Sequence, residues 1–600
     1  MDINQHFPSD KLQSHYCIFS FQEALTKLKK NNVDVICQNV LQSPLVTHPD
    51  LVRRVAFNIL HAASIRPGII PYLVDLCKYL IDNQTTQNSL SGFKDLIAPK
   101  DIPHQRWYRS FLINCINKKV ITIEEFMNLL TSFPPGESIY LLFCWFAPVI
   151  QSRDQVVYEN ILSFFNEDPN LTPELKFFKK NFDKMQKNDW DLQRKYFQNG
   201  YYKISYAYYI KKDKVNKFMK LSCCGEFVDD KKDKKDVLVV AEDHIKKEES
   251  KEEGSKEEDS KEEGSKEEDS KEEDFKEDDD KEDDEIKYTF NKNDKLGSYV
   301  EKFDFDQRIE DSLFERCDFI RHRPTLLQFA AFFGSMKCFV LILSKGADPC
   351  ITDDEGKILI QFVIAGGNMK IFNTCLNSKH IFFRDKECKK KYNPTYVYKA
   401  IQTSIEFDRF EMLIQLIDQF EVDITKPLGE FPSVIHYAAM YNNIRILLFC
   451  IDRGCSVNLQ DSNGRTPLHY AAQYCQYDAL YALIDAYDID VNAKDETGKT
   501  PLHLAAKNNK VDAIPILSID PNIDLNSCDI NGNNAVITAT KHGYNDIVYY
   551  LLCQNIDVNH KNEIGMAPLH FAVTKGHTQL VSLLLTHMYI DINIQDRKGV

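Results

Sequence analysis

Residues 466–472 read TPLHYAA, and the same pattern returns 34 residues later as TPLHLAA at residues 500–506. Degraded copies continue the phase on both sides, including PLHFA at residues 568–572. The position of the motif's His recurs at steps of 33 to 38 residues and is filled by Gln328, Gln361, Tyr398, His436, His469, His503, Ile537 and His570. A helix-turn-helix unit of this length cannot bury its apolar face alone, so the period predicts copies stacked into an all-α solenoid.

The parts of one unit follow from its residues. The Thr of the motif is expected to cap the first helix, and the Pro after it fits the first turn, where a missing N–H costs nothing. A second apolar run follows, and then a finger that ends in Val-Asn, Leu-Asn or Ile-Asn. Asp-x-x-Gly turns at residues 461–464, 495–498 and 529–532 restart the cycle, because Gly accepts the positive φ of a tight turn.

These motifs carry a resemblance to a known family. Residues 316–600 resemble ankyrin-repeat proteins, which are marked by T-P-L-H-x-A at a period of about 33 residues. The resemblance implies a solenoid that binds partner proteins through its concave face and its fingertips. It also implies that the recurring His side chains bond the backbone across the turn, which makes them structural residues and not ligands for a metal.

A second resemblance reaches further toward the N-terminus. Residues 313–342 and 358–372, with a junction at residues 190–218, are similar to the large ankyrin-repeat families of parasitic protists, typified by Trichomonas. In those families a helical N-terminal region of uncharacterised function, the domain called DUF3447, runs into the repeats. This resemblance implies a fold and a habit of binding proteins, and it carries over no functional residue.

The cysteine pattern and the hydropathy of the chain indicate the cellular compartment of the protein. The 17 cysteines are scattered without a C-x-x-C motif, which is typical of reduced, buried thiols and not of a disulfide or zinc scaffold. Residues 1–11 lack the apolar stretch of a secretory signal. The longest apolar run, at residues 139–150, is shorter than the roughly 20 residues of a spanning helix and is interpreted as a buried helix. We therefore expect a cytoplasmic protein with no membrane span, metal or cofactor.

The net charge of −15 is concentrated in one tract. Residues 241–286 hold 25 Asp and Glu against 9 Lys, and almost no apolar residue, so this tract is expected to be disordered. Its negative charge disfavours nucleic-acid binding. Five serines with Glu three positions later resemble the acidic substrates of casein kinase 2, with a plain solvated tether as the alternative: Ser250, Ser255, Ser260, Ser265 and Ser270.

Four regions follow from these patterns. Residues 1–195 show helical spacing without the repeat phase and are expected to form an irregular helical domain that feeds into the repeats. Residues 196–222 are interpreted as a first, divergent repeat, and residues 223–302 as an acidic insertion before its finger. Residues 303–600 hold about eight repeats. The alternative to an insertion is a linker between two independent domains; an insertion is plausible because closing a long loop adds little entropic cost.

Catalytic patterns are weak in this chain. Gly498-Lys499-Thr500 imitates the end of a phosphate-binding loop, but Ala493 stands where its first Gly is required, so the segment is interpreted as a turn and a helix cap. No G-x-S-x-G, H-E-x-x-H or kinase set occurs. We expect a non-enzymatic scaffold or adaptor. A regulatory subunit or effector that recruits a partner enzyme comes second, and an enzyme with activity in the N-terminal helical region comes third.

Candidate partner contacts are side chains that the repeat does not dictate. They lie after the His position and at the turns, where aromatic residues beside basic ones fit the composition of protein interfaces. The position after the His can also be covered by the neighbouring repeat. The predicted contact residues are Tyr437, Asn463, Arg465, Tyr470, Thr497, Lys499, Leu504 and Phe571, and Ile564 is a further candidate at a turn.

Three departures from the repeat remain. Pro515 falls inside a second helix and is expected to kink or shorten it. The basic cluster KECKKK at residues 386–391 is a candidate contact for the acidic insertion. The last repeat, around Leu580 and Leu585, has no polar capping unit after it. Either the sequence is truncated there, or its open end is covered by a partner or by end-to-end association with a second copy.

Overall fold

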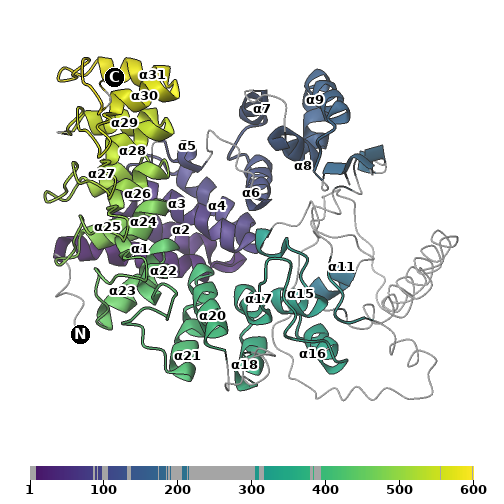
Figure 1. Ribbon diagram of the computed structural model, residues 1–600. Coiled ribbons are helices and arrows are strands. Elements are labelled where there is room, and N and C mark those ends of the chain that lie inside the picture. The colour runs from purple at the N-terminus through teal and green to yellow at the C-terminus, as the bar shows by residue number, and fades with distance from the viewer. Residues whose placement is uncertain are drawn as a thin grey trace, which may run out of the picture.

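The computed structural model describes residues 9–85, 88–90, 92–97, 106–131, 137–172, 175–176, 178–180, 182–183, 185–186, 190, 193, 206–212, 214, 304–309, 317–378, 383, 393–554, 556–597 and 599. The regular structure of these residues is helical, with two isolated bridges and no strand, which confirms the all-α prediction (Figure 1). The acidic insertion with its five serines, the basic cluster at 386–391 and residues 215–222 of the divergent repeat lie outside the described residues.

The array consists of paired helices whose first members stack on one another along the solenoid. The pairs in the described residues are α15 (Leu326–Phe332) with α16 (Met336–Ser344), α17 (Leu359–Gly366) with α18 (Met369–Asn377), α20 (Pro394–Glu406) with α21 (Phe410–Phe420), α22 (Val434–Met440) with α23 (Ile444–Asp452), α24 (Pro467–Tyr474) with α25 (Tyr477–Ile484), α26 (Pro501–Lys507) with α27 (Ala513–Leu517), α28 (Ala535–His542) with α29 (Asn545–Leu552), and α30 (Pro568–Lys575) with α31 (Thr578–Leu585).

In three of the helix pairs the motif His ties the first helix to the next unit. In α24 the Nδ1 of His469 accepts the N–H of the N-cap residue Thr466 at 3.1 Å. Because Nδ1 is an acceptor, Nε2 carries the proton, and it donates to the carbonyl of Lys499 in the following turn at 2.9 Å. His436 and His503 make the same link to the carbonyls of Arg465 and Asn533, each at 2.9 Å. These contacts confirm the structural role predicted for His436, His469 and His503.

Pro515 shortens its helix as predicted. α27 has five residues, whereas α25 in the preceding unit has eight. A proline inside a helix removes one backbone hydrogen bond and clashes with the preceding turn, so the helix cannot extend through it at full length.

The N-terminal region folds into its own group of helices. They are α1 (Ser9–Thr26), α2 (Val33–Gln42), α3 (Pro49–Ile65), α4 (Ile70–Asp82), α5 (Phe93–Ile97), α6 (Arg106–Asn117), α7 (Ile123–Thr131), α8 (Glu137–Arg153) and α9 (Gln155–Glu167). The apolar run at residues 139–150 forms most of α8, and nearly all of its side chains are buried, as expected. Among the helices of the described residues, none combines the length and the hydropathy needed to cross a bilayer.

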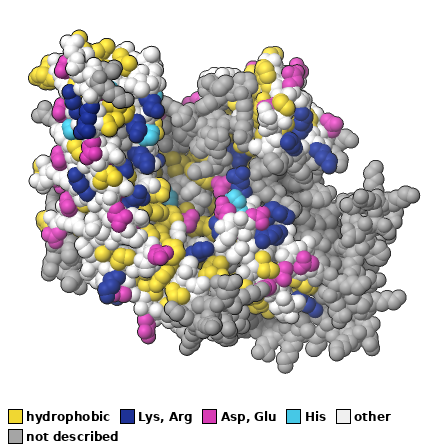
Figure 2. All heavy atoms as spheres, in the orientation of Figure 1, with side chains coloured by type: hydrophobic (Ala, Val, Ile, Leu, Met, Phe, Trp, Pro, Cys, Tyr) yellow, Lys and Arg dark blue, Asp and Glu magenta, His cyan; other side chains and the backbone are white. Residues whose placement is uncertain are grey.

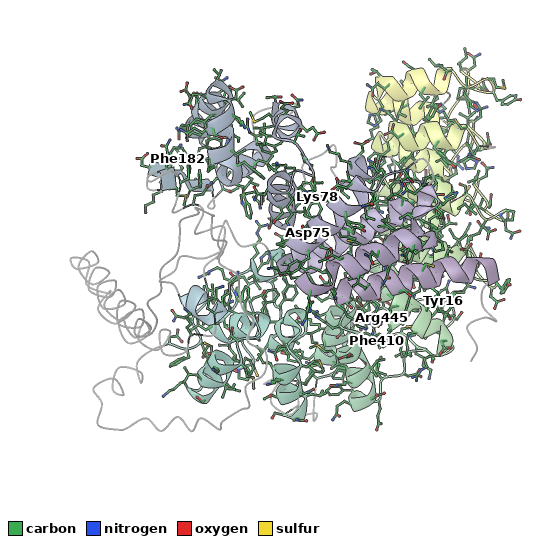
Figure 3. All side chains as sticks on the ribbon, turned by 180° about the vertical axis from the view of Figure 1, so that it is seen from behind. Tyr16, Asp75, Lys78, Phe182, Phe410 and Arg445 are labelled. Carbon is green, nitrogen blue, oxygen red and sulfur yellow. The ribbon has the colours of Figure 1, made fainter. Side chains whose placement is uncertain are left out.

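The N-terminal helices do not simply lead into the repeats, as the sequence suggested, but fold back onto the middle of the array. α1 packs against α23 and α25, which lie more than 400 residues further along the chain. Figures 1 and 3 show the purple helices α1–α4 running beside the green part of the array. The start of the array is covered separately, because α11 (Tyr206–Lys211) packs against α15. The rest of the predicted divergent repeat remains a prediction.

Candidate protein-binding surface

The finger turns are held in shape by their aspartates. Oδ1 of Asp461 accepts the N–H groups of Asn463 at 2.9 Å and Arg465 at 2.8 Å. Oδ1 of Asp495 accepts those of Thr497 and Lys499 at 2.8 and 2.9 Å, and Asp529 repeats the pattern one finger later. Side-chain oxygens of Asp commonly satisfy turn N–H groups in this way. Each tip therefore has a fixed backbone on which its side chains are displayed.

Neighbouring fingers are also joined to one another. The N–H of Glu496 donates to the carbonyl of Asn463 at 3.0 Å, and the N–H of Ile530 donates to that of Thr497 at 3.1 Å. Gly498 adopts φ +70°, and a Cβ there would lie 2.8 Å from the backbone nitrogen of Ile530. The close approach of successive fingers thus depends on glycine at the turn. The fingers form one continuous edge.

The acid–base state of the turns favours this rigidity. Burial acts to raise the pKa of Asp461, but the hydrogen bonds from the Tyr470 hydroxyl, at 2.7 Å, and from the backbone N–H groups outweigh it, so the pKa of that carboxyl is lowered. The pKa of Asp495 is lowered in the same way, because hydrogen bonds from Thr497 and the backbone outweigh burial. Both carboxylates are therefore charged at neutral pH and remain acceptors.

Four of the eight predicted contact residues lie on this edge. Asn463 and Thr497 are at the tips, and Arg465 and Lys499 are half-buried on the stems below them. The guanidinium of Arg465 lies 3.7 Å from the carboxylate of Asp495 in the next finger, and the Lys499 ammonium donates to the hydroxyl of Thr497 at 2.8 Å. The structure thus brings these four side chains into one neighbourhood.

The other four predicted residues are not exposed. Tyr437, Tyr470, Leu504 and Phe571 retain at most 9% of their accessible surface. The Tyr470 ring packs edge-on against His436 of the preceding repeat, with centroids 5.7 Å apart, while its hydroxyl is bound to Asp461. The assumption that these four were surface residues is therefore wrong, since each repeat covers the position after the His of its neighbour.

Two exposed apolar residues also lie at the tips, and one of them, Ile530, is absent from the predicted contacts. Ile530 and Ile564 are 60% and 57% exposed. Ile530 occupies the turn position that Ser462 and Glu496 fill in earlier fingers, and Ile564 occupies the position of Asn463 and Thr497. An isoleucine in a tight, solvent-facing turn is unusual, and that was the available signal. Figure 2 shows charges of both signs along one face of the array and exposed hydrophobic side chains at its C-terminal end. The edge is therefore mixed in chemistry, with isolated apolar points.

On the opposite side of the array, formed by the turns between paired helices, α1 and α3 cover the middle repeats. The carboxylate of Asp478 in α25 accepts hydrogen bonds from Arg54, from Asn58 at 2.6 Å and from Asn442 at 2.8 Å. Asp478 has no exposed surface, and Arg54 has 3%. No sequence period marks this site, because its members are single polar residues from distant segments. The structure alone reveals it.

The described residues do not assemble a recognisable reactive centre. Cys528 Sγ lies 3.3 Å from His560 Nε2, but burial raises the pKa of this thiol, which is the opposite of what a nucleophilic cysteine needs. Within the part of the chain that the structure describes, no three His, Cys, Asp or Glu residues are placed to hold a metal ion. Lys499 and Thr500 lie in a turn and a helix N-cap, as interpreted from the sequence.

Comparison with known proteins adds the family of the array. A family model described as ankyrin repeats matches three overlapping segments, residues 404–495, 435–527 and 502–596. The putative ankyrin repeat protein FPV230 of Fowlpox virus is 29% identical over 141 residues, which are 23% of this chain and 69% of that protein. Ankyrin repeat protein nuc-2 of Neurospora crassa is 33% identical over 92 residues, and protein glp-1 of Caenorhabditis elegans is 23% identical over 169 residues.

The matches cover part of this chain and short parts of two of the relatives. The aligned regions make up 15% and 27% of this chain, but only 8% of nuc-2 and 13% of glp-1. The family model matches within the repeats, and residues 404–596 are ankyrin repeats. Ankyrin repeats are generally protein-interaction modules, so the finger edge is the surface on which such an interaction is to be sought.

Proposed function

We propose that this ankyrin-repeat protein is a non-enzymatic scaffold or adaptor that binds a partner protein along its finger edge. The observation that carries the proposal is the row of tip side chains, from Asn463 and Thr497 to Ile530 and Ile564, on turns fixed by buried aspartate and asparagine side chains. A preformed surface binds at a lower cost in conformational entropy than a mobile one. The exposed isoleucines supply apolar contact, and Arg465 and Lys499 supply charge.

The affinity of such an edge rests on few residues. Interfaces take most of their binding energy from a small number of well-packed apolar or aromatic anchors and from Arg, surrounded by contacts of little energetic weight. Ile530 and Ile564 are exposed apolar residues of the tips, one finger apart, and are the proposed anchors. Asn463 and Thr497 are the proposed polar surroundings.

Affinity capture from native lysate tests the proposal. Full-length wild type is compared with the double variant Ile530→Glu, Ile564→Glu and with a matched control, Val35→Glu, Val156→Glu, whose sites are 57% and 67% exposed on N-terminal helices. Circular dichroism confirms that all three are folded. Loss of partners from the tip variant alone supports the finger edge. Partners that survive the tip variant, or that are lost only from the control, contradict it.

The second candidate is a regulatory subunit or effector that recruits an enzyme. It uses the same edge and differs in the partner's identity, so recovery of an enzyme in the capture, lost with the tip variant, would favour it. We also infer a cytoplasmic location, in keeping with the free thiols of the described cysteines. The similarity of the N-terminal region to DUF3447 is part of this proposal, and it assigns no activity.

Self-association through the last helix pair is a separate proposal. Leu585 at the end of α31 is exposed, and beyond the helix Met588 is 81% exposed, Tyr589 is 73% exposed and Ile592 is also exposed. We propose that a second copy covers these side chains. Sedimentation of wild type against Met588→Lys, Tyr589→Glu tests it: a concentration-dependent dimer abolished by the substitutions supports the contact, and a wild-type monomer at high concentration rejects it.

A further inference from the structure

The contact between the N-terminal helices and the array crosses several repeats. Asp478 lies at the start of α25, and Asn442 lies in the turn before α23, one repeat earlier. Gln22 of α1 joins both repeats, since its side chain accepts the N–H of Ile444 at 3.1 Å and donates to the Asn442 carbonyl at 3.0 Å and to the Asp478 carboxylate at 3.4 Å. It also donates to Asn58 of α3 at 2.7 Å. Two N-terminal helices and two repeats therefore share one buried hydrogen-bond network.

The ends of α3 extend this contact to the repeats on either side. Arg53 lies 3.8 Å from Asp512, just before α27. Arg66, which caps the C-terminus of α3, lines a cavity of about 30 Å³ together with Asp408, just before α21. The 17 residues of α3 span about 25 Å. Four successive repeats are separated by three helix-to-helix spacings of about 8–10 Å each, which together cover about the same distance. α3 thus spans the turns of four successive repeats.

Apolar and aromatic contacts complete the interface. Phe57 of α3 meets Tyr477 of α25 edge-on, with ring centroids 5.3 Å apart. The guanidinium of Arg54 also lies over the ring of Tyr481, 5.1 Å from its centroid. On α1, His15 lies 3.1 Å from the carboxylate of Asp485 in a buried setting. The interface is therefore specific in its geometry, with charged, polar and aromatic pairs in fixed register.

Solenoids are held together one neighbour at a time. Each repeat contacts only the repeats beside it, so bending accumulates along the array. The contacts among the paired helices follow this rule in the described residues, because each pair meets the pair before it and the pair after it. The N-terminal helices are different, since α1 contacts α23 and α25 and α3 reaches one repeat further at each end.

We propose that α1 and α3 form a built-in brace that fixes the curvature of the array from α21 to α27, with the Asp478 site as its lock. A carboxylate that accepts hydrogen bonds from Arg54, Asn58 and Asn442 is satisfied only when α3 is docked and both repeats are in register. The lock therefore couples the position of α3 to the angle between neighbouring repeats. The brace acts from the side opposite the fingers and leaves the finger edge open. The proposal of a brace does not depend on whether the finger edge binds a partner.

Hydrogen–deuterium exchange on the full-length chain tests the brace. Asp478→Asn keeps the shape of the side chain and removes its charge. The expected result is faster exchange, by about tenfold or more, in α1, α3, α23 and α25 together, with α28–α31 unchanged. Small-angle scattering should show a larger maximum dimension for the same variant. Asp529→Asn is the matched control, because it alters a buried aspartate in a finger turn away from α3.

The outcomes separate a brace from ordinary local packing. Faster exchange confined to α25, or scattering identical to wild type, overturns the proposal. The same distributed change in the Asp529→Asn control would also overturn it. If Asp478→Asn unfolds the whole array, Asn58→Ala decides by the same criteria, because it removes a neutral donor and leaves the Arg54–Asp478 pair in place.

Discussion

The two long sides of the array are stabilised in different ways. On the finger side, the same Asp-centred turn and the same finger-to-finger hydrogen bond recur in successive repeats. On the side of the helix-to-helix turns, Asp478 and its donors occur once and join segments more than 400 residues apart. A hydrogen-bonding arrangement that recurs in several repeats tolerates the loss of one copy better than an arrangement that occurs once. Substitutions at the single site should therefore have larger and more distant effects.

Arg54→Met should cause the greatest loss of stability. The substitution leaves the Asp478 carboxylate buried without its charged partner, and such losses cost about 3–5 kcal/mol. Chemical denaturation of the full-length chain measures it. Arg53→Met is the matched control, because Arg53 and Asp512 are about half exposed and their pair is worth at most about 1 kcal/mol. Equal losses for the two variants would contradict the central role of the buried pair.

Gly498→Ala should cost less, about 1–3 kcal/mol. The added methyl group meets positive φ and also the backbone nitrogen of Ile530 in the next finger, 2.8 Å away. Gly576→Ala is the control, since Gly576 has φ +72° but open space where a Cβ would lie. A larger loss of unfolding free energy for Gly498→Ala than for Gly576→Ala would measure the finger-to-finger approach. Equal losses of unfolding free energy would mean that the positive φ alone, and not the close approach of the fingers, causes the effect.

Much of the finger side could be predicted from the sequence, and the turn side could not. The period, the Thr and Pro at the helix start, the structural His and the short α27 all follow from local rules, and the structure bears them out. The docking of α1 and α3 depends on Gln22, Arg54 and Asp478, which have no shared spacing or motif. The sequence also suggests an exposed residue after the motif His. Its burial depends on how closely neighbouring repeats approach, which the sequence does not show.

Acidification should lower the free energy of unfolding by a smaller amount per repeat than Gly498→Ala does. Burial lowers the pKa of His436, His469 and His503 below the usual value. The unfolded chain therefore binds more protons than the folded one once the pH falls below about 6.5. The stabilisation that the three neutral His side chains give the fold is complete above that pH. It is lost as the pH falls toward their folded-state pKa. Denaturation midpoints at about pH 7.5 and about pH 5.5, on either side of the unfolded-state pKa, measure this difference.

A substitution already present in the array provides the control for that pH dependence. Gln328 occupies the His position of α15, where its side chain accepts the N–H of Thr325 at 2.8 Å and donates to the carbonyl of Ile351 at 2.8 Å. Replacing His436, His469 and His503 by Gln should keep the hydrogen bonds and reduce the pH dependence. An unchanged pH dependence in the triple variant would show that other groups cause it.

Substitutions at the fingertips should affect stability least. Ile530→Glu with Ile564→Glu changes two side chains that are more than half exposed, so the unfolding free energy should change by no more than about 0.5 kcal/mol per site. Thermal unfolding measures this directly. A loss of several kcal/mol would mean that the tips are part of the packing, and partner loss in the capture experiment could then no longer be assigned to the surface.

Hydroxyl-radical footprinting of the full-length chain, alone and in the captured complex, shows which of the two sides a partner occupies. We expect Ile530 and Ile564 to be oxidised readily in the free protein and protected in the complex. Phe57 and Tyr477, whose rings pack across the brace, should change little between the two states. Protection that appears at Phe57 and Tyr477 while the tips stay reactive would refute binding at the finger edge, because the partner would then occupy the side assigned to the N-terminal helices.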